Sequence, residues 1–409
     1  MRILFVAYLF QPEPNAICGL PFAKELVKLG HEVEVLATYP NYPGGRVYDG
    51  YRMRLLQRET MDGIPVLRVP LYPSHDKSGL RRIISYTSFA LSTATIGVLA
   101  VRPADVAYIC QGPATLGLPG AVLRLIRGIP FVYNIQDLWP DSLLSTGMFN
   151  SPLGLRLVGS WCRWVYRRAA RVVVITPGMK RLLGERGVPP EKIEVIYNWC
   201  DDSQLECPRA DPALADRLGL AGRFNVVFAG NMGAAQSLHA VLAAAEIVKT
   251  RYPRVQFVLI GGGVETEPLK QRAAAAGLSN VRFLARRPMS EVAPILRMAD
   301  VLLVHLKDDP LFRITIPSKT QAYMATGRPI LMGVRGDAAD LVTRAAAGLA
   351  CEPENPHSIA EAVGRLQAMS PAELDAMGAN GRRFYDEELS IKIGARRYEQ
   401  VFAAVSPGS

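Results

Sequence analysis

The stretch FNVVFAGNMGAAQSLHAVLAAAEIVKTRYPRVQFVLIGGG, residues 224–263, decides the fold class. The apolar runs Phe224–Ala229 and Val255–Ile260 have the length of buried strands, and Leu238–Thr250 between them is typical of a helix. A strand, a helix and a second strand in this order form a βαβ unit, whose two strands lie parallel in one sheet. The stretch therefore predicts an α/β fold with a parallel sheet.

The same alternation runs along the whole chain. Before residue 200, further strands are expected at Ile3–Tyr8, Val33–Leu36, Val66–Val69, Val106–Cys110, Phe131–Asn134, Val172–Ile175 and Ile193–Ile196. After residue 263, strands are expected at Val281–Leu284, Val301–Leu306 and Pro329–Met332, with helices at Leu269–Ala276, Ser290–Met298 and Ser318–Thr326. The polar segment Cys200–Arg223 separates the two sets. We expect two Rossmann-like, doubly wound domains, 1–200 and 201–385, and a C-terminal helix in 386–409 that packs back across the domains.

Charge is distributed unevenly between these domains. The chain has 409 residues and a formal net charge of +10. Residues 1–200 hold 23 Lys+Arg and 14 Asp+Glu, whereas the remainder holds 24 and 23. The first domain therefore carries almost all the excess positive charge, which favours an anionic partner such as a phosphorylated lipid or a membrane surface over nucleic acid.

The spacing of the cysteines predicts neither a set of disulfides nor a metal site. They are Cys18, Cys110, Cys162, Cys200, Cys207 and Cys351, without a CxxC pair or metal-ligand spacing. We interpret them as reduced thiols of a cytoplasmic protein. The apolar opening MRILFVAYLF is interpreted as a first buried strand and not as a signal peptide, because it soon meets Gln11-Pro12-Glu13-Pro14.

One segment keeps a membrane under consideration. Ile83–Val101 contains no charged residue and is bracketed by Arg81, Arg82 and Arg102. Serines and threonines dilute its apolar content, so we favour a helix packed on the sheet. An interfacial helix touching lipid is the second interpretation, and a full membrane span is the third.

Ligands of doubly wound sheets bind beyond the carboxyl ends of the strands. In the first domain these ends lead to Gly19, which opens a helix, and to Asp137, which directly follows a strand. Glycine at a helix start lets backbone N–H groups approach a phosphate, so Gly19 is a donor-binding candidate. A carboxylate at the end of an apolar strand is costly unless it is paired or faces a cleft. We therefore favour a catalytic role for Asp137. We expect Asp141 only to cap the next helix.

In the second domain two glycine-rich strand ends lie in adjacent βα units. Candidate contacts to a diphosphate are Gly230, Asn231, Gly233, Gln236, Gly261, Gly262 and Gly263. Downstream, Pro317 and Ser318 suit a helix start, and Arg313 or Lys319 offers positive charge for a phosphate. No GxGxxG, GxxxxGK[ST], GxSxG or HExxH motif is present, and no carboxylate pair directly ends a strand, so no metal site is predicted.

At these residues the chain resembles the family-4 retaining glycosyltransferases of the GT-B fold. The resemblance runs nearly end to end and includes Lys24–Val33, Val174–Thr176, Ile196–Asp201, Gly230–Gly233, Gly261–Gly263 and Pro317–Pro329. It implies two Rossmann-like domains facing a cleft, with a nucleotide-sugar donor in the C-terminal one and an acceptor in the N-terminal one. The segments Pro40–Gly45 and Val69–His75 look like the branch that adds fucose-type or acetamido sugars to bacterial surface polysaccharides.

Two departures from the family pattern affect the site. Many members carry two glutamates eight positions apart, where this chain has Ile314 and Ala322. Many also place Arg and Lys in the diphosphate loop, where this chain offers Asn231 and Gln236. We therefore expect Lys319 to neutralise the diphosphate, and no metal or other cofactor to be required.

The resemblance implies transfer to a lipid-linked acceptor, with a polyprenyl diphosphate as the expected carrier, at the inner face of the cytoplasmic membrane. Two alternatives stay open. A nucleotide-sugar epimerase shares the architecture, and a non-catalytic sugar-nucleotide-binding, membrane-associated protein would tolerate the missing glutamates. Nucleic-acid binding is not expected, because the arginines among Trp161–Arg171 lie at helical spacing typical of an interfacial face.

Overall fold

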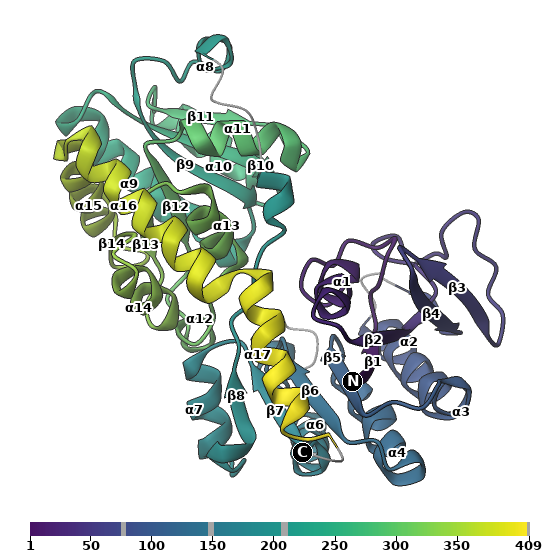
Figure 1. The fold of residues 1–409 in the computed structure, drawn as a ribbon. Helices are drawn as coiled ribbons and strands as arrows, with labels where there is room; N and C mark the ends of the chain where they lie inside the picture. The colour runs from purple at the N-terminus through teal and green to yellow at the C-terminus, as the bar shows by residue number, and fades with distance from the viewer. Residues whose placement is uncertain (75–78, 146–150, 206–211, 407–409) are drawn as a thin grey trace. The chain divides into compact units, whose positions relative to one another are not determined.

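In the computed structural model, which describes residues 1–74, 79–145, 151–205 and 212–406, the chain forms two α/β units. The first comprises Met1–Asn198 and Ile391–Ser409, and the second comprises Trp199–Ser390. Each is a sheet of mainly or wholly parallel strands with helices packed against it (Figure 1). Cys207 and His75 lie outside the described residues. The predicted fold class, two doubly wound α/β domains, is confirmed.

The first unit has an eight-stranded sheet in the order β3-β4-β2-β1-β5-β6-β7-β8. Its strands are β1 Arg2–Ala7, β2 Glu32–Thr38, β3 Gln57–Met61, β4 Ile64–Val69, β5 Val106–Gln111, β6 Phe131–Ile135, β7 Arg171–Val174 and β8 Ile193–Val195. Neighbours are parallel except β3, which pairs antiparallel with β4. Strand β3 was not expected, because its sequence QRETM is polar and its edge position leaves it half exposed.

Helices cover both faces of this sheet. They are α1 Leu20–Lys28, α2 Gly79–Ser92, a π-helical turn η1 Thr93–Gly97, α3 Val98–Ala100, α4 Gly117–Arg127, α5 Asp141–Ser145, α6 Pro152–Arg168, α7 Pro177–Glu185 and α17 Ile391–Ala403, with short 3₁₀ turns η2 Ala114–Leu116 and η3 Pro190–Lys192. The crossovers that contain α2, α4, α6 and α7 all step toward β8, whereas α1 steps toward β2. Right-handed crossovers therefore place these four helices on one face and α1 on the other.

The last helix of the chain belongs to the first unit. On α17, the ring of Tyr398 lies 5.1 Å from that of Phe22 and 5.2 Å from that of Tyr108, centroid to centroid. Glu399 approaches the buried His31 at 3.1 Å. Helix α17 packs beside α1, so these aromatic contacts complete the core on that face of the sheet.

The second unit has a six-stranded parallel sheet in the order β11-β10-β9-β12-β13-β14. Its strands are β9 Phe224–Asn231, β10 Val255–Gly262, β11 Val281–Leu284, β12 Val301–His305, β13 Ile330–Gly333 and β14 Gly348–Ala350. The helices and turns are η4 Asp202–Leu205, α8 Pro212–Leu218, η5 Ala234–Gln236, α9 Leu238–Arg251, α10 Thr266–Ala275, α11 Met289–Met298, α12 Pro310–Arg313, α13 Ser318–Thr326, α14 Asp337–Arg344, α15 Pro356–Ala368, α16 Pro371–Phe384 and the π-helical turn η6 Tyr385–Leu389.

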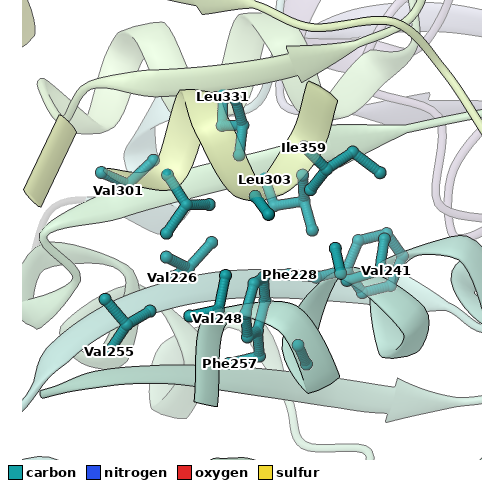
Figure 2. Packing of buried hydrophobic residues seen from close by; sticks show 14 of the residues in the cluster. Val226, Phe228, Val241, Val248, Val255, Phe257, Val301, Leu303, Leu331 and Ile359 are labelled. Atoms are coloured by element: carbon teal, nitrogen blue, oxygen red, sulfur yellow. The ribbon is translucent and has the colours of Figure 1, made fainter. Parts of the chain in front are cut away.

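The stretch that decides the fold also forms the centre of this core. Val226 and Phe228 on β9, Val241 and Val248 on α9, and Phe257 on β10 are fully buried and pack together (Figure 2). Burial of such side chains contributes about 1.5–3 kcal/mol each. The core therefore fixes β9 and β10 side by side, which sets the position of the glycines at their carboxyl ends.

One expectation about the cysteines is wrong. Cys18 and Cys110 form a disulfide, although 92 residues separate them in the sequence. Cys18 lies in the loop after β1 and Cys110 at the end of β5, and these two strands are neighbours in the sheet. Cys162, Cys200 and Cys351 are free thiols, as expected.

We predict that a reducing agent destabilises the wild-type protein and leaves a Cys18→Ser/Cys110→Ser variant unaffected. Closing a loop of this length stabilises a fold by about 4.6 kcal/mol through the entropy of the unfolded chain. Denaturant unfolding with and without reductant measures the difference. Equal stability of the wild-type protein in both conditions would show that the bond does not form in solution.

Candidate functional site

The carboxyl ends of β9 and β10 form a pair of glycine turns. Gly261 is in register with Gly230, and Gly262 with Asn231. Gly230 and Gly261 have φ values of +141° and +138°, which side chains rarely adopt. A Cβ on Gly261 would lie 1.9 Å from the carbonyl oxygen of Gly230. Only glycine fits there, so this edge of the sheet presents backbone without side chains.

Lys319 lies directly against this edge. A Cβ on Gly230 would be 2.7 Å from Lys319 Cε and 3.0 Å from Nζ. The ammonium group also lies 4.9 Å from the centroid of the Phe228 ring, a favourable cation–π position. No hydrogen bond or ion pair of this ammonium group occurs with the residues that the structure describes. Desolvation lowers the pKa of Lys319, so an anion at this edge would relieve an uncompensated charge.

Helix α13 brings Lys319 to this position. Pro317 is its N-cap and has no side-chain atom that could accept a hydrogen bond, so the first amides of the helix, beginning at Ser318, are not capped by a side chain. Farther along the helix, the hydroxyl of the buried Tyr323 accepts a hydrogen bond of 2.9 Å from the Ala229 amide on β9. An uncapped helix start with a lysine in its first turn is suited to binding phosphate.

The loop after β9 is stabilised from within. The side-chain oxygen of Gln236 accepts a hydrogen bond of 2.9 Å from the Gly233 amide, and the Met232 amide donates to the Gly262 carbonyl at 2.9 Å. A Cβ on Gly233 would lie 2.8 Å from the Asn231 side chain, and one on Gly263 would lie 2.4 Å from a carbonyl oxygen. Gln236 therefore shapes the loop, and its side-chain oxygen is already occupied.

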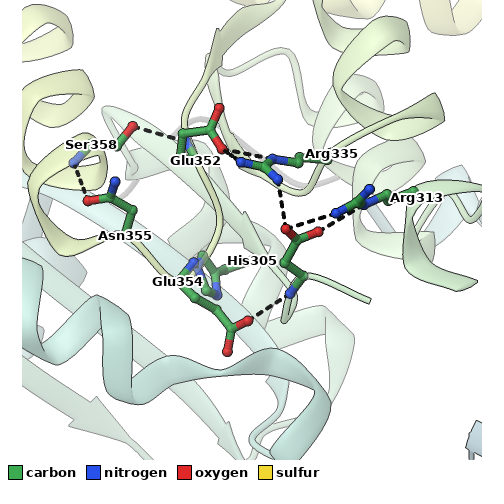
Figure 3. A network of polar contacts seen from close by, with 8 residues as sticks. His305, Arg313, Arg335, Glu352, Glu354, Asn355 and Ser358 are labelled. Carbon is green, nitrogen blue, oxygen red and sulfur yellow. Dashed lines mark hydrogen bonds and ion pairs between the residues drawn. The ribbon is translucent and has the colours of Figure 1, made fainter. Parts of the chain in front are cut away.

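His305 connects this loop to the next strand end. Its Nδ1 lies 2.8 Å from the Gln236 carbonyl, so it donates there, and its Nε2 accepts from the Glu354 amide at 3.1 Å. The Glu354 carboxylate accepts from the Asp308 amide (Figure 3). It also accepts from the Ser237 hydroxyl. Burial lowers the pKa of His305, which favours the neutral ring that these two bonds require.

The expected donor-binding residue Arg313 is already paired. Its guanidinium donates two hydrogen bonds to the carboxylate of Asp308, at 3.0 and 3.1 Å, and Arg335 binds the same carboxylate at 2.8 Å (Figure 3). Arg313 holds the pKa of Asp308 below its usual range. Lys319 is therefore a better candidate than Arg313 for an open phosphate-binding cation.

At the corresponding edge of the first unit, the loop before α1 is tightly built. A Cβ on Gly19 would lie 2.0 Å from the carbonyl oxygen of Asn15. The first amide of α1, at Leu20, donates to the side chain of Gln11 at 2.8 Å. Gly19 thus allows a close approach of backbone to backbone, and one of the helix amides expected to face a phosphate is already satisfied.

Asp137 follows β6 and stays exposed at the surface of this edge. Its backbone carbonyl accepts a hydrogen bond of 3.1 Å from Gln111, while its carboxylate has no hydrogen bond or ion pair within the described ranges. The surrounding protein desolvates the carboxyl and raises its pKa. Asp141, by contrast, forms a two-point ion pair with Arg186, both bonds being 2.7 Å long. The carboxylate of Asp137 is therefore available to bind a ligand, whereas that of Asp141 has a structural role.

The sequence did not predict that two charged residues of the first unit, Glu13 and Arg68, are buried. Glu13 accepts hydrogen bonds of 2.7 Å from the Asn41 and Tyr42 amides, and Arg68 binds Glu59 and the Thr38 carbonyl at 2.5 Å. Both side chains are fully buried. The only signal in the sequence was a glutamate between two prolines. Together they fix the loops that follow β1 and β2.

Within the described ranges, no group of three or more His, Cys, Asp or Glu side chains is arranged to hold a metal ion. The positions where many relatives have glutamates carry Ile314 and Ala322, and α13 presents no carboxylate there.

Comparisons with known proteins agree with this architecture. Residues 20–199 match the family model described as "Glycosyl transferase 4-like domain", and residues 223–368 match "Glycosyl transferases group 1". The chain is 26% identical over 301 residues to "Probable glycosyltransferase WbjE" of Pseudomonas aeruginosa, which covers 73% of this chain and 74% of that protein. It is 28% identical over 336 residues to "Putative colanic acid biosynthesis glycosyl transferase WcaI" of Escherichia coli, covering 80% and 82%.

Solved structures show the same fold at low identity. Sucrose-phosphate synthase from Thermosynechococcus elongatus superposes with a TM-score of 0.70 and 17% identity over 98% of this chain and 99% of its own. Anabaena Alr3699/HepE in complex with UDP-glucose gives 0.69 and 17% over 99% and 100%. These likenesses support two Rossmann-like domains of the same type.

We predict that Gly230→Ala destabilises the second unit, because a side chain is strained at its φ of +141° and the new methyl group meets the end of the Lys319 side chain. A residue other than glycine that is held at a sparsely populated φ costs about 1–3 kcal/mol. Gly277→Ala is the matched control, because Gly277 also has a positive φ but has no atom within 4 Å of the added Cβ. Denaturant unfolding should give a larger loss for Gly230→Ala, and adding Lys319→Ala should recover part of it. Equal losses in the two alanine variants would contradict the contact.

Proposed function

The chain belongs to the glycosyltransferases of the GT-B fold, and we propose that it transfers a sugar, with retention of configuration, from a nucleotide-diphosphate sugar to a lipid-diphosphate-linked acceptor. The donor we favour is a UDP- or GDP-linked fucose-type or N-acetylated amino sugar. The product would be a bacterial surface polysaccharide, such as an O-antigen, a capsule or an exopolysaccharide. The name of WcaI, which refers to colanic acid biosynthesis, supports this assignment.

The observation that carries the donor side is the uncompensated ammonium group of Lys319 at the glycine turns. When the bond between the sugar and the diphosphate breaks, negative charge grows on the departing diphosphate and an oxocarbenium-like centre forms on the sugar. A cation and helix amides fixed in advance stabilise that charge without reorganisation. We assign this role to Lys319 and the start of α13, with Gly230 and Gly261 leaving room for the phosphates.

We propose that the reaction needs no metal or other cofactor, because Lys319 supplies the positive charge that a divalent cation supplies in other nucleotide-sugar enzymes. Asp137 is assigned to the acceptor hydroxyl or to the sugar of the donor. Its carboxylate has no partner among the described residues and its pKa is raised, which suits a group that accepts a proton.

Membrane contact is proposed for the helix formed by α2, η1 and α3. By length and composition, Gly79–Ala100 is long and apolar enough to cross a membrane, because its most apolar 18 residues have a mean hydropathy of 1.5. Only 39% of these residues are buried, which is less than is typical of a helix in a protein core. Its inner side packs on the sheet through residues such as Phe89 and Val98. Its outer stripe is exposed and uncharged, and comprises Leu80, Ile84, Thr87, Leu91, Thr95 and Leu99.

Neighbouring elements extend this outer stripe. Arg127 on α4 donates to the Val98 carbonyl at 2.9 Å, which places the end of α4 beside α3. There Leu125 and Ile126 are 84% and 59% exposed. Arg82 near the start of α2 and Arg102 after α3 add positive charge at the two ends. Apolar side chains framed by arginines fit the surface of an anionic bilayer, so we place the enzyme peripherally at the inner face of the cytoplasmic membrane.

We predict that thermal unfolding in a panel of nucleoside diphosphates and their sugars identifies the donor. A ligand at 100 times its Kd stabilises the protein by about 2.7 kcal/mol. Lys319→Ala should abolish that shift and lower turnover about 10²–10³-fold, whereas Lys270→Ala, which removes an exposed ion pair on α10, should change neither. Release of labelled sugar should require an added acceptor. Unchanged turnover in Lys319→Ala would remove this residue from the mechanism.

We predict an acid limb in the pH profile of turnover at a pKa above 3.8, the usual value for aspartate. Because the raised pKa keeps Asp137 protonated to higher pH, activity that needs the carboxylate falls as the pH drops through that value. Asp137→Asn should lower turnover strongly and remove the limb without altering the unfolding free energy by much. A limb that persists in Asp137→Asn would belong to another group.

We predict salt-sensitive binding to vesicles that contain phosphatidylglycerol and weak binding to neutral vesicles. Ile84→Asp and Leu91→Asp each put a charge on the outer stripe and should reduce sedimentation with vesicles at least about tenfold. Met289→Asp is the matched control, because Met289 is also a partly exposed apolar residue but lies in the second unit. If all three variants bind vesicles as the wild-type protein does, the outer stripe is not a membrane surface.

A further inference from the structure

A second basic feature lies in the loop between β2 and β3. Residues 47–58 border a cavity of about 680 Å³ that is open to solvent and is lined by Arg52, Arg54 and Arg58. This volume falls in the range of small-molecule sites. The loop leaves the carboxyl end of β2 and enters β3 beside the carboxyl end of β4, because Gln57 pairs with Arg68. The cavity therefore lies at the edge of the first sheet where ligands of doubly wound folds bind.

The charge of this cavity is not compensated. Arg58 is held by Glu34 at 3.3 Å. The guanidinium groups of Arg52 and Arg54, in contrast, have no hydrogen bond or ion pair within the described part of the chain, and Asp49 is the one acidic residue of the lining. The two unpaired guanidinium groups of Arg52 and Arg54 against the one carboxylate of Asp49 leave a net positive site. Guanidinium groups bind phosphate through two parallel hydrogen bonds.

The loop is braced before any ligand arrives. The hydroxyl of the buried Tyr39 accepts from the Arg54 amide at 3.1 Å and donates to the Arg54 carbonyl at 3.4 Å. The Tyr48 amide donates to the Pro40 carbonyl at 3.0 Å. The guanidinium of the fully buried Arg68 lies 5.2 Å from the centroid of the Tyr51 ring. Binding to a loop fixed in this way costs less ordering entropy than binding to free arginines.

We infer that this cavity binds a phosphate or diphosphate group of the acceptor. The inference rests on the proposed function for the identity of that acceptor. Strand β2 is three strands away from β6, which ends before Asp137, and strands are spaced by about 4.8 Å. The lining also includes Gln57 and Arg58 of β3, two strands farther along the sheet, so the diphosphate would be held on the order of 14–24 Å from Asp137 along the sheet edge. This span suits an acceptor whose reacting hydroxyl is separated from its diphosphate by sugar.

Isothermal titration with inorganic diphosphate at low ionic strength tests the cavity. Because the glycine turns beside Lys319 offer a second diphosphate site, the titration is run on the Lys319→Ala protein. In that background we expect binding, a loss of at least about tenfold on adding Arg52→Ser/Arg54→Ser, and a loss of less than about twofold on adding Arg46→Ser. Arg46 is the matched control, because it is an exposed arginine of the same loop that does not line the cavity. Arg52 and Arg54 are also exposed, so the double variant should fold, and its unfolding curve checks this.

Three further arms separate the alternatives. If Lys319→Ala abolishes diphosphate binding and the double variant retains it, the anion binds at the glycine turns and the inference is overturned. If the double variant loses binding to phosphatidylglycerol vesicles but keeps inorganic diphosphate in the Lys319→Ala background, the arginines contact lipid headgroups and the inference is also overturned. Farnesyl diphosphate should bind the wild-type protein more tightly than it binds the double variant, and equal affinity would contradict the assignment.

The cavity and the proposed function can fail separately. If UDP and GDP do not bind and no sugar is transferred, the proposed function fails, while loss of inorganic diphosphate in the double variant would still establish an anion site. If sugar is transferred but Arg52→Ser/Arg54→Ser leaves diphosphate binding unchanged in the Lys319→Ala background, the cavity inference fails alone.

Discussion

The close approach of Lys319 to Gly230 is the contact on which the proposed donor site of the second unit depends. A methyl group on Gly230 would occupy the position of the lysine side chain. The packing of β9, α9 and β10 fixes the glycine, and the bond between Tyr323 and Ala229 fixes the helix that carries the lysine. An isolated half-buried cation is costly. The fold sustains that cost at a place where a diphosphate would remove it, and this is why we base the donor site on this contact.

The two units prepare positive charge in different ways. In the second, one desolvated ammonium group lies behind backbone that has no side chains, and His305 holds the neighbouring loop through the Gln236 carbonyl. In the first, Arg52 and Arg54 are exposed but the loop that bears them is anchored by buried residues, chiefly Tyr39. Desolvation strengthens the attraction between a single cation and a bound anion. At an exposed site water and salt screen this attraction, so several charges are needed to reach similar affinity. The proposed diphosphate leaving group would suit the desolvated ammonium group of the second unit, and the proposed lipid-linked acceptor would suit the exposed arginines of the first.

Local patterns predict much of the fold but little of the polar detail. The strands of the parallel core could be placed within a few residues, because buried strands are continuous apolar runs. Strand β3 could not, because its polar sequence forms a strand only beside β4. The disulfide between Cys18 and Cys110 follows from strand order, which the sequence does not state. Lys319 could be proposed from its place in a helix start, but only the structure shows that Arg313 is engaged with Asp308. Pairing and burial are products of packing, so they emerge only in three dimensions.

The last helix has a consequence for how the protein is made. Helix α17 supplies Tyr398 to the aromatic cluster of the first unit, together with Phe22 and Tyr108. The first 198 residues thus leave the ribosome without a part of their own core, and almost two hundred further residues must be translated before it arrives. The second unit, which is continuous in sequence, has every strand of its sheet before that point. Synthesis order and folding order therefore differ, and the half of the protein made first is the half completed last.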